Sequence, residues 1–340
     1  MHVLIVKLSA IGDVVHTLPA VAALRREIPD VRISWVVERA AAAILRDSPV
    51  IDRLIEIDTR SWRKSLLRLE TQKALRSRLS SLRSEPVDVA IDFQGLIKSG
   101  FVALASGAPR RIGFSSEALR EPASRVFLTE QVPVDDRGHI IEKNIELVRA
   151  LGVEAAGDYD FPIEVPDAAI DAMEAQAPAD GYAILNPGGG WPTKLWPAAS
   201  FGRLADSIRA SQGVVSLVTY GPGEDELAGE VAAASTTGNA IPFRCSLVEF
   251  VALARKAKVF VGGDTGPLHL AAAAGAPIVG LYGPTSPLRN GPFDPRDRTI
   301  GRSDIDCRTD CYRRSCDKWI CMEIPVEAVQ RLVDARLQTT

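Results

Sequence analysis

The fold class is indicated first by the N-terminal stretch Val3-Leu4-Ile5-Val6-Lys7-Leu8-Ser9-Ala10-Ile11-Gly12-Asp13. Its apolar beginning, Val3–Lys7, is typical of a short buried strand in a parallel sheet. Ser9–Asp13 follows as a loop with one glycine, and a helical pattern then runs from about Asp13 to Glu27. A strand that leads through a loop into a helix predicts an α/β domain.

The same alternation continues along the chain. We expect strands at 31–37, 53–57, 87–93, 182–185, 214–219, 259–262 and 278–282. Helices are expected at 61–84, 141–151, 198–210, 224–234, 247–257, 268–274 and 326–337. The segment 152–178 is rich in Gly, Pro, Asp and Ala, which favours a domain boundary there.

The alternation therefore predicts an α/β protein with two Rossmann-like, doubly wound domains that face each other across a cleft. We place the domains at 1–160 and 161–324, followed by a closing helix at 325–340 that could pack back on the first domain. Ligands of such sheets bind outside the carboxyl ends of the strands.

Composition and charge limit the class of protein. The 340 residues are 46% hydrophobic and 24% charged, as in ordinary globular proteins, and the net charge of −3 argues against a nucleic-acid partner. We find no signal-peptide pattern at the N-terminus and no apolar stretch of the ~18–20 residues that a membrane span requires. The sequence predicts a cytoplasmic protein that is at most peripheral to a membrane.

One segment is strongly basic. Between Arg60 and Arg83 there are eight Lys or Arg residues and a single acid, Glu70. Such a run is often only the solvated face of a helix, but it also suits an anionic ligand or a membrane surface. The sequence leaves both interpretations open.

Three loops combine glycines with charged residues. Asp13 follows the first strand and could act as a helix cap or, as an ionised carboxylate, as a base. Gly262-Gly263-Asp264-Thr265-Gly266-Pro267-Leu268-His269 ends a strand and starts a helix, an arrangement that suits phosphate binding. Pro187-Gly188-Gly189-Gly190 precedes Lys194, which could neutralise a diphosphate, although a surface lysine on a rigid turn would look the same.

The cysteines are unevenly distributed. Four of the five, Cys307, Cys311, Cys316 and Cys321, occur in the last tenth of the chain. In a reducing compartment such a cluster predicts a structural zinc or iron site, with free or partly disulfide-bonded thiols as the alternative.

Taken together, these segments resemble the ADP-heptose:lipopolysaccharide heptosyltransferases, and heptosyltransferase I members most closely. The likeness is carried by Lys7 with Gly12-Asp13 and His16-Thr17-Leu18-Pro19, by Arg60-Ser61-Trp62-Arg63-Lys64, by Asp92-Phe93-Gln94-Gly95-Leu96-Ile97-Lys98-Ser99, by Arg120-Glu121-Pro122 and His139, and by Lys194-Leu195-Trp196-Pro197 and Asp264–His269.

The resemblance implies the GT-B architecture and an inverting transfer of L-glycero-D-manno-heptose from ADP-heptose to a lipid A acceptor carrying 3-deoxy-D-manno-octulosonic acid (Kdo). It implies Asp13 as the general base. The implied donor-binding residues are Thr193, Lys194, Glu224, Asp264, Thr265, Gly266 and His269. The implied acceptor-binding residues are Lys7, His16, Arg60, Arg63, Lys64, Gln94, Lys98, Arg120 and His139.

The resemblance also predicts where the protein works and what it needs. The expected place is the cytoplasmic face of the inner membrane of a Gram-negative bacterium, where the enzyme would be peripheral. No metal-binding D-x-D motif is present, so we expect no cofactor to be required for catalysis. The four cysteines are absent from the best-known heptosyltransferase I members. They leave open a heptosyltransferase II-like or a protein-heptosylating enzyme with a C-terminal metal site.

Overall fold

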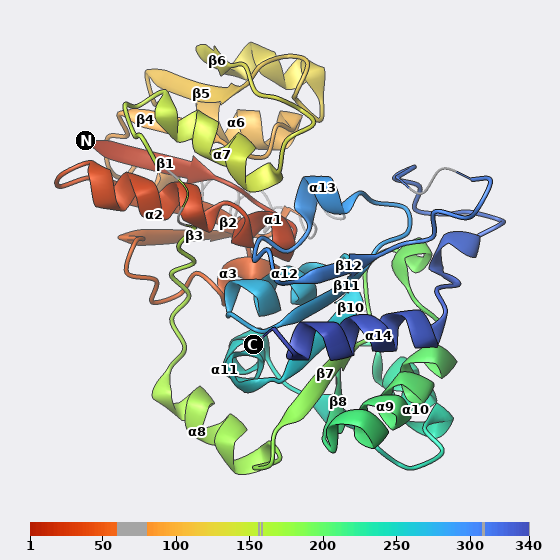
Figure 1. Cartoon of the computed structure of the whole chain (residues 1–340). Coiled ribbons are helices and arrows are strands. Elements are labelled where there is room, and N and C mark those ends of the chain that lie inside the picture. The colour runs from red at the N-terminus through yellow and green to blue at the C-terminus, as the bar shows by residue number, and fades with distance from the viewer. Residues whose placement is uncertain (60–79, 156, 158, 308–309, 340) are drawn as a thin grey trace, which may run out of the picture. The chain divides into compact units, whose positions relative to one another are not determined.

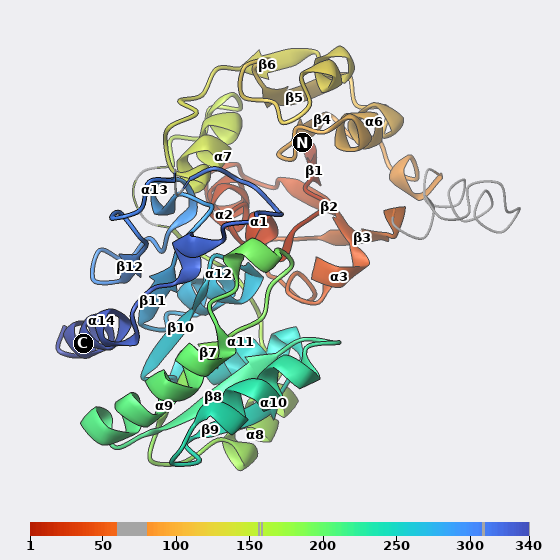
Figure 2. The same ribbon diagram turned by 90° about the vertical axis from the view of Figure 1, so that its right-hand side faces the viewer.

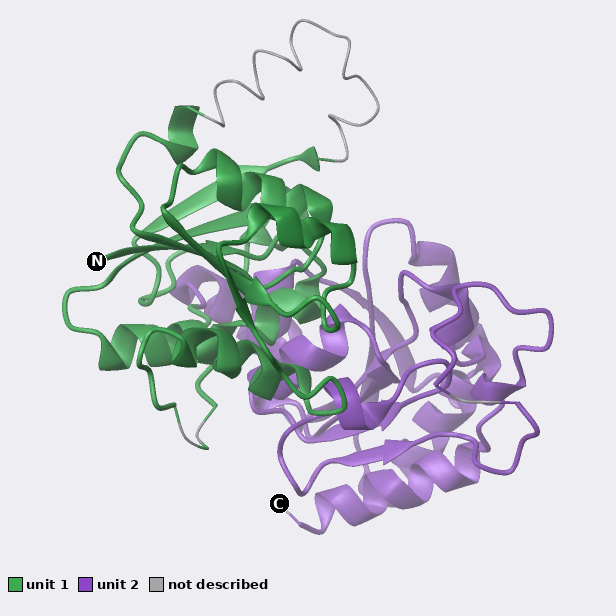
Figure 3. Ribbon diagram, turned by 90° about the horizontal axis from the view of Figure 1, so that it is seen from above, with its two compact units in different colours: residues 1–164 green, residues 165–340 purple. Residues whose placement is uncertain are grey.

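The computed structural model describes residues 1–59, 80–155, 157, 159–307 and 310–339 (Figure 1). It divides into two compact units, Met1–Glu164 and Val165–Thr340, which Figure 3 colours separately. Each unit is built on a six-stranded sheet with helices. The predicted fold class, α/β with two Rossmann-like units, is confirmed.

Unit 1 has the strand order β3-β2-β1-β4-β5-β6, and all neighbours pair in parallel. Its strands are β1 (His2–Val6), β2 (Arg32–Glu38), β3 (Arg53–Ile57), β4 (Val89–Asp92), β5 (Arg110–Phe114) and β6 (Glu130–Val132). Its described helices are α1 (Ile11–Val15), α2 (Leu18–Glu27), α3 (Arg39–Ala42), α6 (Ile97–Ala105), the 3-10 helix η1 (Pro122–Phe127) and α7 (Ile140–Arg149).

Unit 2 repeats this topology with the order β12-β11-β10-β7-β8-β9, again wholly parallel. Its strands are β7 (Tyr182–Asn186), β8 (Val215–Tyr220), β9 (Ala240–Arg244), β10 (Val259–Gly263), β11 (Ile278–Leu281) and β12 (Arg298–Ile300). Its helices are α8 (Asp167–Gln176), α9 (Ala198–Gln212), α10 (Asp225–Ala234), α11 (Leu247–Lys256), α12 (Gly266–Ala273), α13 (Pro287–Asn290), α14 (Val326–Leu337), η2 (Pro192–Lys194) and η3 (Ile320–Met322). Helices α9 and α10 lie against strands β8 and β9 (Figure 2).

The strand order fixes where a ligand site can form in each unit. The chain moves outward from β1 to β3 and then returns to the other side of β1 with β4, so the order reverses between β1 and β4. In unit 2 it reverses between β7 and β10. The loops that leave these four strands diverge at the carboxyl edge of their sheet, which opens a crevice for a ligand.

The structure corrects the sequence analysis at several points. The single helix predicted from Asp13 to Glu27 is wrong, because α1 and α2 are separate helices and Pro19 lies in the first turn of the second. Helix α8 occupies part of the segment expected to be a linker. Strands β5, β6, β9 and β12 were not predicted. The predicted helix 61–84 lies mostly outside the described residues.

The closing helix α14 belongs to unit 2. Val329 and Val333 on its inner face are fully buried in a core cluster with Leu185, Val261 and Val279 of the unit 2 sheet. The structure thus packs α14 on the sheet of its own unit, and packing against the first domain stays a prediction. The units divide after Glu164, four residues beyond the predicted boundary. Among the described helices we find none with the length and apolar character to cross a bilayer.

Candidate functional site

Asp13 lies in the loop-to-helix segment that follows β1. Its Oδ2 accepts a hydrogen bond from the Ala10 amide at 3.1 Å, and Arg120 Nη1 lies 3.5 Å away. The side chains of Asp13 and Arg120 are 27% and 50% exposed. Asp13 is therefore a carboxylate that a solute can reach, held beside an exposed guanidinium.

The loop that carries Asp13 is fixed by the neighbouring loop after β4. Gln94 Oε1 accepts hydrogen bonds from the amides of Leu8 at 3.0 Å and Ser9 at 3.1 Å. Lys7 Nζ donates to the Phe93 carbonyl at 2.7 Å. Both Lys7 and Gln94 are buried, so their functional groups tie the two loops of the crevice together.

Asp92, at the end of β4, shapes the same turn. Its carboxylate accepts hydrogen bonds from the amides of Gln94 and Gly95 at 2.9 and 3.1 Å and from Ser99 Oγ at 3.0 Å. Burial raises the pKa of Asp92 to about 6, although these hydrogen bonds and the charge of Lys7 act in the opposite direction. Sequence reasoning did not assign Asp92 a role.

The Gly95 turn places Arg120 next to Asp13. Gly95 has φ +67°, and its carbonyl accepts a hydrogen bond from the Glu121 amide at 3.0 Å. A Cβ at Gly95 would lie 3.3 Å from the Leu119 side chain, so glycine allows the chain to pass closely there.

The other acceptor candidates of unit 1 are spread around this crevice. His16 is buried with its ring centroid 5.8 Å from that of His139, whose Nδ1 accepts a hydrogen bond from the Ile141 amide and caps α7. Lys98 Nζ lies 3.7 Å from Glu38 Oε1 and is 40% exposed. The structure thus leaves Arg120 exposed and Asp13 and Lys98 partly exposed. Arg60, Arg63 and Lys64 lie outside the described residues.

In unit 2 the loops after β7 and β10 meet in a charged cluster. Lys194 Nζ donates to Asp264 Oδ2 at 2.6 Å and to the Asp264 carbonyl at 2.8 Å, and it lies 4.6 Å from the centroid of the Trp191 ring. Asp264 Oδ1 contacts His269 Nε2 at 3.0 Å and accepts from Asn290 Nδ2 at 2.5 Å. Three of the predicted donor residues are therefore in mutual contact, namely Lys194, Asp264 and His269.

Electrostatics favour the ionised form of the Asp264 carboxylate. Burial alone would raise the pKa of Asp264, but His269 and Lys194 outweigh it and hold that pKa far below its usual value. The carboxylate is nearly inaccessible, so it positions the lysine and does not itself reach a ligand. An ammonium has three N–H donors, and the contacts to other described residues use two.

Glycines in the β7 loop leave space for neighbouring side chains. A Cβ at Gly188 would lie 2.4 Å from Glu224 Cδ, and Glu224 Oε2 accepts a hydrogen bond from the Gly221 amide at 2.7 Å. A Cβ at Gly189 would lie 2.6 Å from Thr265 Cγ2. Glu224 and Thr265 thus line the glycine loop, and their contact with the donor stays a prediction.

The two threonines of the donor set differ. Thr265 precedes Gly266, the first residue of α12, and its Oγ1 is buried without a hydrogen bond to any described residue. Thr193 Oγ1 is already used, since it donates to the Arg313 carbonyl at 2.7 Å. Thr265 is the better placed of the two to bind a ligand oxygen.

Comparison with known proteins identifies the family. The sequence profile described as glycosyltransferase family 9 (heptosyltransferase) matches residues 75–319. Lipopolysaccharide heptosyltransferase 1 of Pseudomonas aeruginosa is 33% identical over 339 residues, which cover 99% of this chain and 92% of that protein. The chain belongs to the heptosyltransferase family. It is a nucleotide-sugar-dependent glycosyltransferase, and the predicted likeness to heptosyltransferase I members is confirmed.

Solved structures agree with this assignment. The E. coli heptosyltransferase WaaC with ADP matches with a TM-score of 0.80 and 27% identity, over 99% of this chain and 100% of that one. WaaC with ADP-2-deoxy-2-fluoro heptose matches with a TM-score of 0.78 and 26% identity, over 98% of this chain and 99% of that one. The two Rossmann-like units of this heptosyltransferase therefore make up the predicted GT-B fold.

Sequence reasoning missed Asn290 of the heptosyltransferase chain. This residue ends α13, its Nδ2 binds Asp264, and its carbonyl accepts a hydrogen bond from the Tyr282 hydroxyl at 3.1 Å. It belongs to none of the recognised motifs. The only available signal was its place in the loop after β11, at the same carboxyl edge of the sheet as Asp264.

The arrangement of the four C-terminal cysteine side chains differs from that of a closed metal site. Of the four, Cys321 is buried and Cys316 is exposed. Burial raises the pKa of Cys321, and negative charge on Cys307 and Cys311 would raise it further, so these sulfurs lie within electrostatic range. In the part of the chain that is described, however, no group of three or more His, Cys, Asp or Glu side chains is placed to hold a metal ion. The arrangement does not fit the predicted tetrathiolate.

Proposed function

We propose that this heptosyltransferase moves L-glycero-D-manno-heptose from ADP-heptose to a Kdo residue of a lipid A acceptor, with inversion at the anomeric carbon. The observation that carries the proposal is full-length similarity, in sequence and in fold, to heptosyltransferase 1 proteins, together with WaaC structures that contain ADP or a fluorinated ADP-heptose. Unit 1 supplies the partly exposed Asp13 and unit 2 supplies the Lys194–Asp264–His269 cluster, a carboxylate and a cation of the kinds that such a transfer requires.

In the proposed reaction Asp13 is the general base. An acceptor hydroxyl oxygen attacks the anomeric carbon of the heptose while the Asp13 carboxylate takes the hydroxyl proton. The bond from that carbon to the ADP oxygen breaks, and ADP leaves with the bonding electrons. Arg120 lies 3.5 Å from Asp13, so it favours the ionised carboxylate and could hold an acceptor anion beside it.

Lys194 would neutralise the charge that develops on the diphosphate. Asp264 and His269 hold its ammonium in place before the reaction, so that little reorganisation is needed as the bond breaks. The Thr265 hydroxyl and the first amides of α12 would supply hydrogen bonds to phosphate oxygens. Because a protein cation already faces the leaving group, we expect a chelator to leave the rate of transfer unchanged.

The acceptor would lie against unit 1. Lys98 and Arg120 offer solvent-accessible cations for its carboxylates or phosphates, and Arg60, Arg63 and Lys64 are proposed to add to them. Lys7, Gln94, His16 and His139 would position these loops. Such an acceptor is a lipid, so we place the enzyme at the cytoplasmic face of the inner membrane of a Gram-negative bacterium, without a nucleic-acid partner.

Acceptor profiling with radiolabelled ADP-heptose tests the proposal. We expect label to enter Kdo–lipid A and to require Asp13. Label that enters only an acceptor already carrying one heptose would identify a heptosyltransferase II-like enzyme. Label that enters only protein hydroxyls would identify a protein heptosyltransferase, and either result would refute the proposed acceptor.

The structural zinc or iron at Cys307, Cys311, Cys316 and Cys321 stays a prediction. It requires the four sulfurs to converge at about 2.3 Å from one ion, closer than in the described arrangement. Elemental analysis of protein prepared without chelators tests it. One equivalent of metal with four protected thiols would support the site, and four titratable thiols without metal would refute it.

A further inference from the structure

Helix α6 exposes an apolar stripe. Its inner side, with Ser99, Val102 and Ala103, is buried in unit 1. On the outer side Ile97, Phe101 and Leu104 are 46%, 47% and 42% exposed. Residues four and seven positions apart lie on one face of a helix, so these side chains form a continuous stripe. A helix that is apolar on its outer face indicates a binding surface.

The 3-10 helix η1 extends the stripe. It packs on α6 at Gly100, where a Cβ would lie 2.7 Å from the Phe127 ring. The next residue toward the N-terminus, Val126, is 72% exposed. We call Ile97, Phe101, Leu104 and Val126 the α6–η1 patch.

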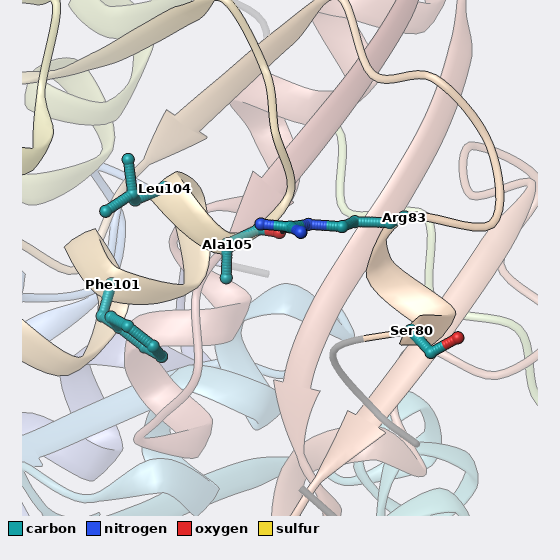
Figure 4. A pocket seen from close by; sticks show the side chains of 5 residues that line it. All are labelled: Ser80, Arg83, Phe101, Leu104 and Ala105. Atoms are coloured by element: carbon teal, nitrogen blue, oxygen red, sulfur yellow. Dashed lines mark hydrogen bonds between the residues drawn. The ribbon is translucent and has the colours of Figure 1, made fainter. Parts of the chain in front are cut away.

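Cations surround this patch. Arg83 donates from Nε to the Ala105 carbonyl at 2.8 Å, and with Ser80 it borders a hollow of about 290 Å³ whose other walls are Phe101, Leu104 and Ala105 (Figure 4). Arg125 of η1 is exposed, and Lys98 on the next face of α6 is partly exposed.

Two acids lie near these groups, since Glu38 Oε1 is 3.7 Å from Lys98 Nζ and Glu121 contacts the start of α6. Glu121 accepts a hydrogen bond from the Ile97 amide at 2.7 Å, so its carboxylate is engaged at the start of α6. The apolar side chains thus lie between exposed cations, the pattern that suits the interface of an anionic bilayer.

The patch is continuous with the proposed acceptor side. Helix α6 starts directly after the Gln94-Gly95 turn, and its first turn carries Lys98. The Glu121 that binds its first amide follows Arg120, which lies beside Asp13. If the membrane binds at this surface, the acyl chains of a lipid acceptor can stay in the bilayer. The sugar head of the acceptor then lies at the carboxyl edge of the sheet.

We propose that the α6–η1 patch docks this enzyme on an anionic phospholipid membrane. Phe101, Leu104 and Val126 enter the interface between headgroups and acyl chains, while Arg83 and Arg125 bind lipid phosphates. The benefit to transfer rests on the proposed lipid acceptor, but membrane binding itself can be measured without any substrate.

Vesicle sedimentation tests the proposal. The full-length protein should bind vesicles of phosphatidylethanolamine with phosphatidylglycerol and bind phosphatidylcholine vesicles weakly. The double variant Phe101→Gln with Leu104→Gln should lose about tenfold or more in partitioning, because two large apolar side chains no longer enter the interface. Arg125→Glu should lower binding to anionic vesicles by about fivefold or more and reduce its salt dependence.

Three further variants serve as controls. Leu288→Gln removes an 80% exposed leucine from α13 and should bind vesicles as the wild type does. Phe101→Leu keeps the apolar character and should retain binding. Val126→Gln alters a side chain with little packing, so it reports on the patch even if the double variant fails to fold.

Transfer assays separate this proposal from the proposed function. The double variant should transfer heptose normally to a de-acylated, water-soluble Kdo acceptor and slowly to Kdo–lipid A in vesicles. Equal vesicle binding by wild type, double variant and Val126→Gln would overturn the docking surface, as would an equal loss with Leu288→Gln. A wild-type dimer that the patch variants abolish would assign the patch to a second copy instead. Patch-dependent vesicle binding without transfer to either acceptor would refute the proposed function alone.

Discussion

Replacing Lys194 with methionine should lower both the free energy of unfolding and the affinity for ADP, and a second substitution should restore only the first. Lys194 is 14% exposed and Asp264 only 2%. Removal of one partner of a buried ion pair costs about 3–5 kcal/mol. Asp264 keeps two other contacts, to His269 and Asn290, so we expect a cost below that range, about 2–3 kcal/mol, for Lys194→Met.

The double variant Lys194→Met with Asp264→Asn removes both charges. Replacing a whole buried pair is often nearly neutral, so the double variant should regain most of the lost stability, to within about 1 kcal/mol of the wild type. ADP affinity should not return, because the cation proposed to face the diphosphate is still missing. One charge-assisted hydrogen bond corresponds to about 10–100-fold in the ADP Kd.

Urea unfolding and ADP calorimetry on the wild type, both single variants and the double variant measure these two effects separately. Lys256→Met is the matched control, since it breaks an ion pair with Glu174 in which both side chains are at least half exposed, and it should change stability by less than about 1 kcal/mol. Unchanged ADP affinity in Lys194→Met would refute its contact with the diphosphate. Single variants as stable as the wild type would refute the energetic importance of the ion pair.

The pH dependence of this effect has a definite sign. The pKa of Asp264 in the folded protein lies below its ordinary value of 3.8. Its contribution to stability is therefore complete above that value and is lost as the pH falls toward the lowered pKa. In Lys194→Met the acid-induced loss should be smaller, because less stabilisation of the carboxylate remains to be lost.

Other variants test the remaining parts of the site. Asp13→Asn should lower kcat by about 10²–10⁴-fold with ADP affinity unchanged in calorimetry; near-normal turnover would exclude it as the base. Burial raises the pKa of Asp92 from 3.8 to about 6 in the folded protein, so its contribution to stability falls as the pH rises through that window. Asp92→Asn should therefore flatten the dependence of the free energy of unfolding on pH in this range, as measured with urea. An unchanged slope would contradict the raised pKa. Gly188→Ala should displace Glu224 and raise the KM for ADP-heptose, whereas Gly190→Ala, with open space around its Cβ, should not; equal effects would remove Glu224 from the donor site. Arg120→Ala should raise the KM for the acceptor and weaken its dependence on salt, and a KM that does not move would show that no acceptor anion binds there.

The sequence predicted the central strands well because they are short apolar runs. Strands β5, β6, β9 and β12 were missed because a search for apolar runs does not find strands that lack one. β5 begins with Arg110-Arg111 and β9 contains Pro242, so neither presents a continuous apolar run. The break between α1 and α2 has a local signal, Pro19 in the first turn of α2, and also a contact from a distant residue. Asn144 of α7 donates to the His16 carbonyl at 2.9 Å, and no local pattern reports such a contact.

The candidate site was predictable in its residue types but not in their orientation. The structure brings Lys194, Asp264 and His269 together, since their motifs end neighbouring strands of one sheet, and their contact with the donor stays a prediction. Lys7 and Gln94 also follow such strands, yet the structure turns both inward, where they satisfy backbone groups. A sequence motif predicts that a residue lies at the crevice but not where its side chain points. Only packing decides whether its side chain faces the ligand or supports the loop.

The repeated topology explains why the two units supply opposite charges from equivalent places. In each unit the loop after the first strand carries the group proposed to act, Asp13 in unit 1 and Lys194 in unit 2. The loop after the fourth strand supports it, through Gln94 in one case and Asp264 in the other.

A glycosyl transfer needs a base for the incoming hydroxyl and a positive charge for the departing diphosphate. Gln94 fixes the Asp13 loop through its amide carbonyl and adds no charge, so the carboxylate stays accessible as a base. Asp264 carries a full negative charge and holds the Lys194 ammonium in position through two hydrogen bonds. We propose that equivalent crevices in the two units serve the two ends of one reaction, with the base in unit 1 and the cation for the leaving group in unit 2.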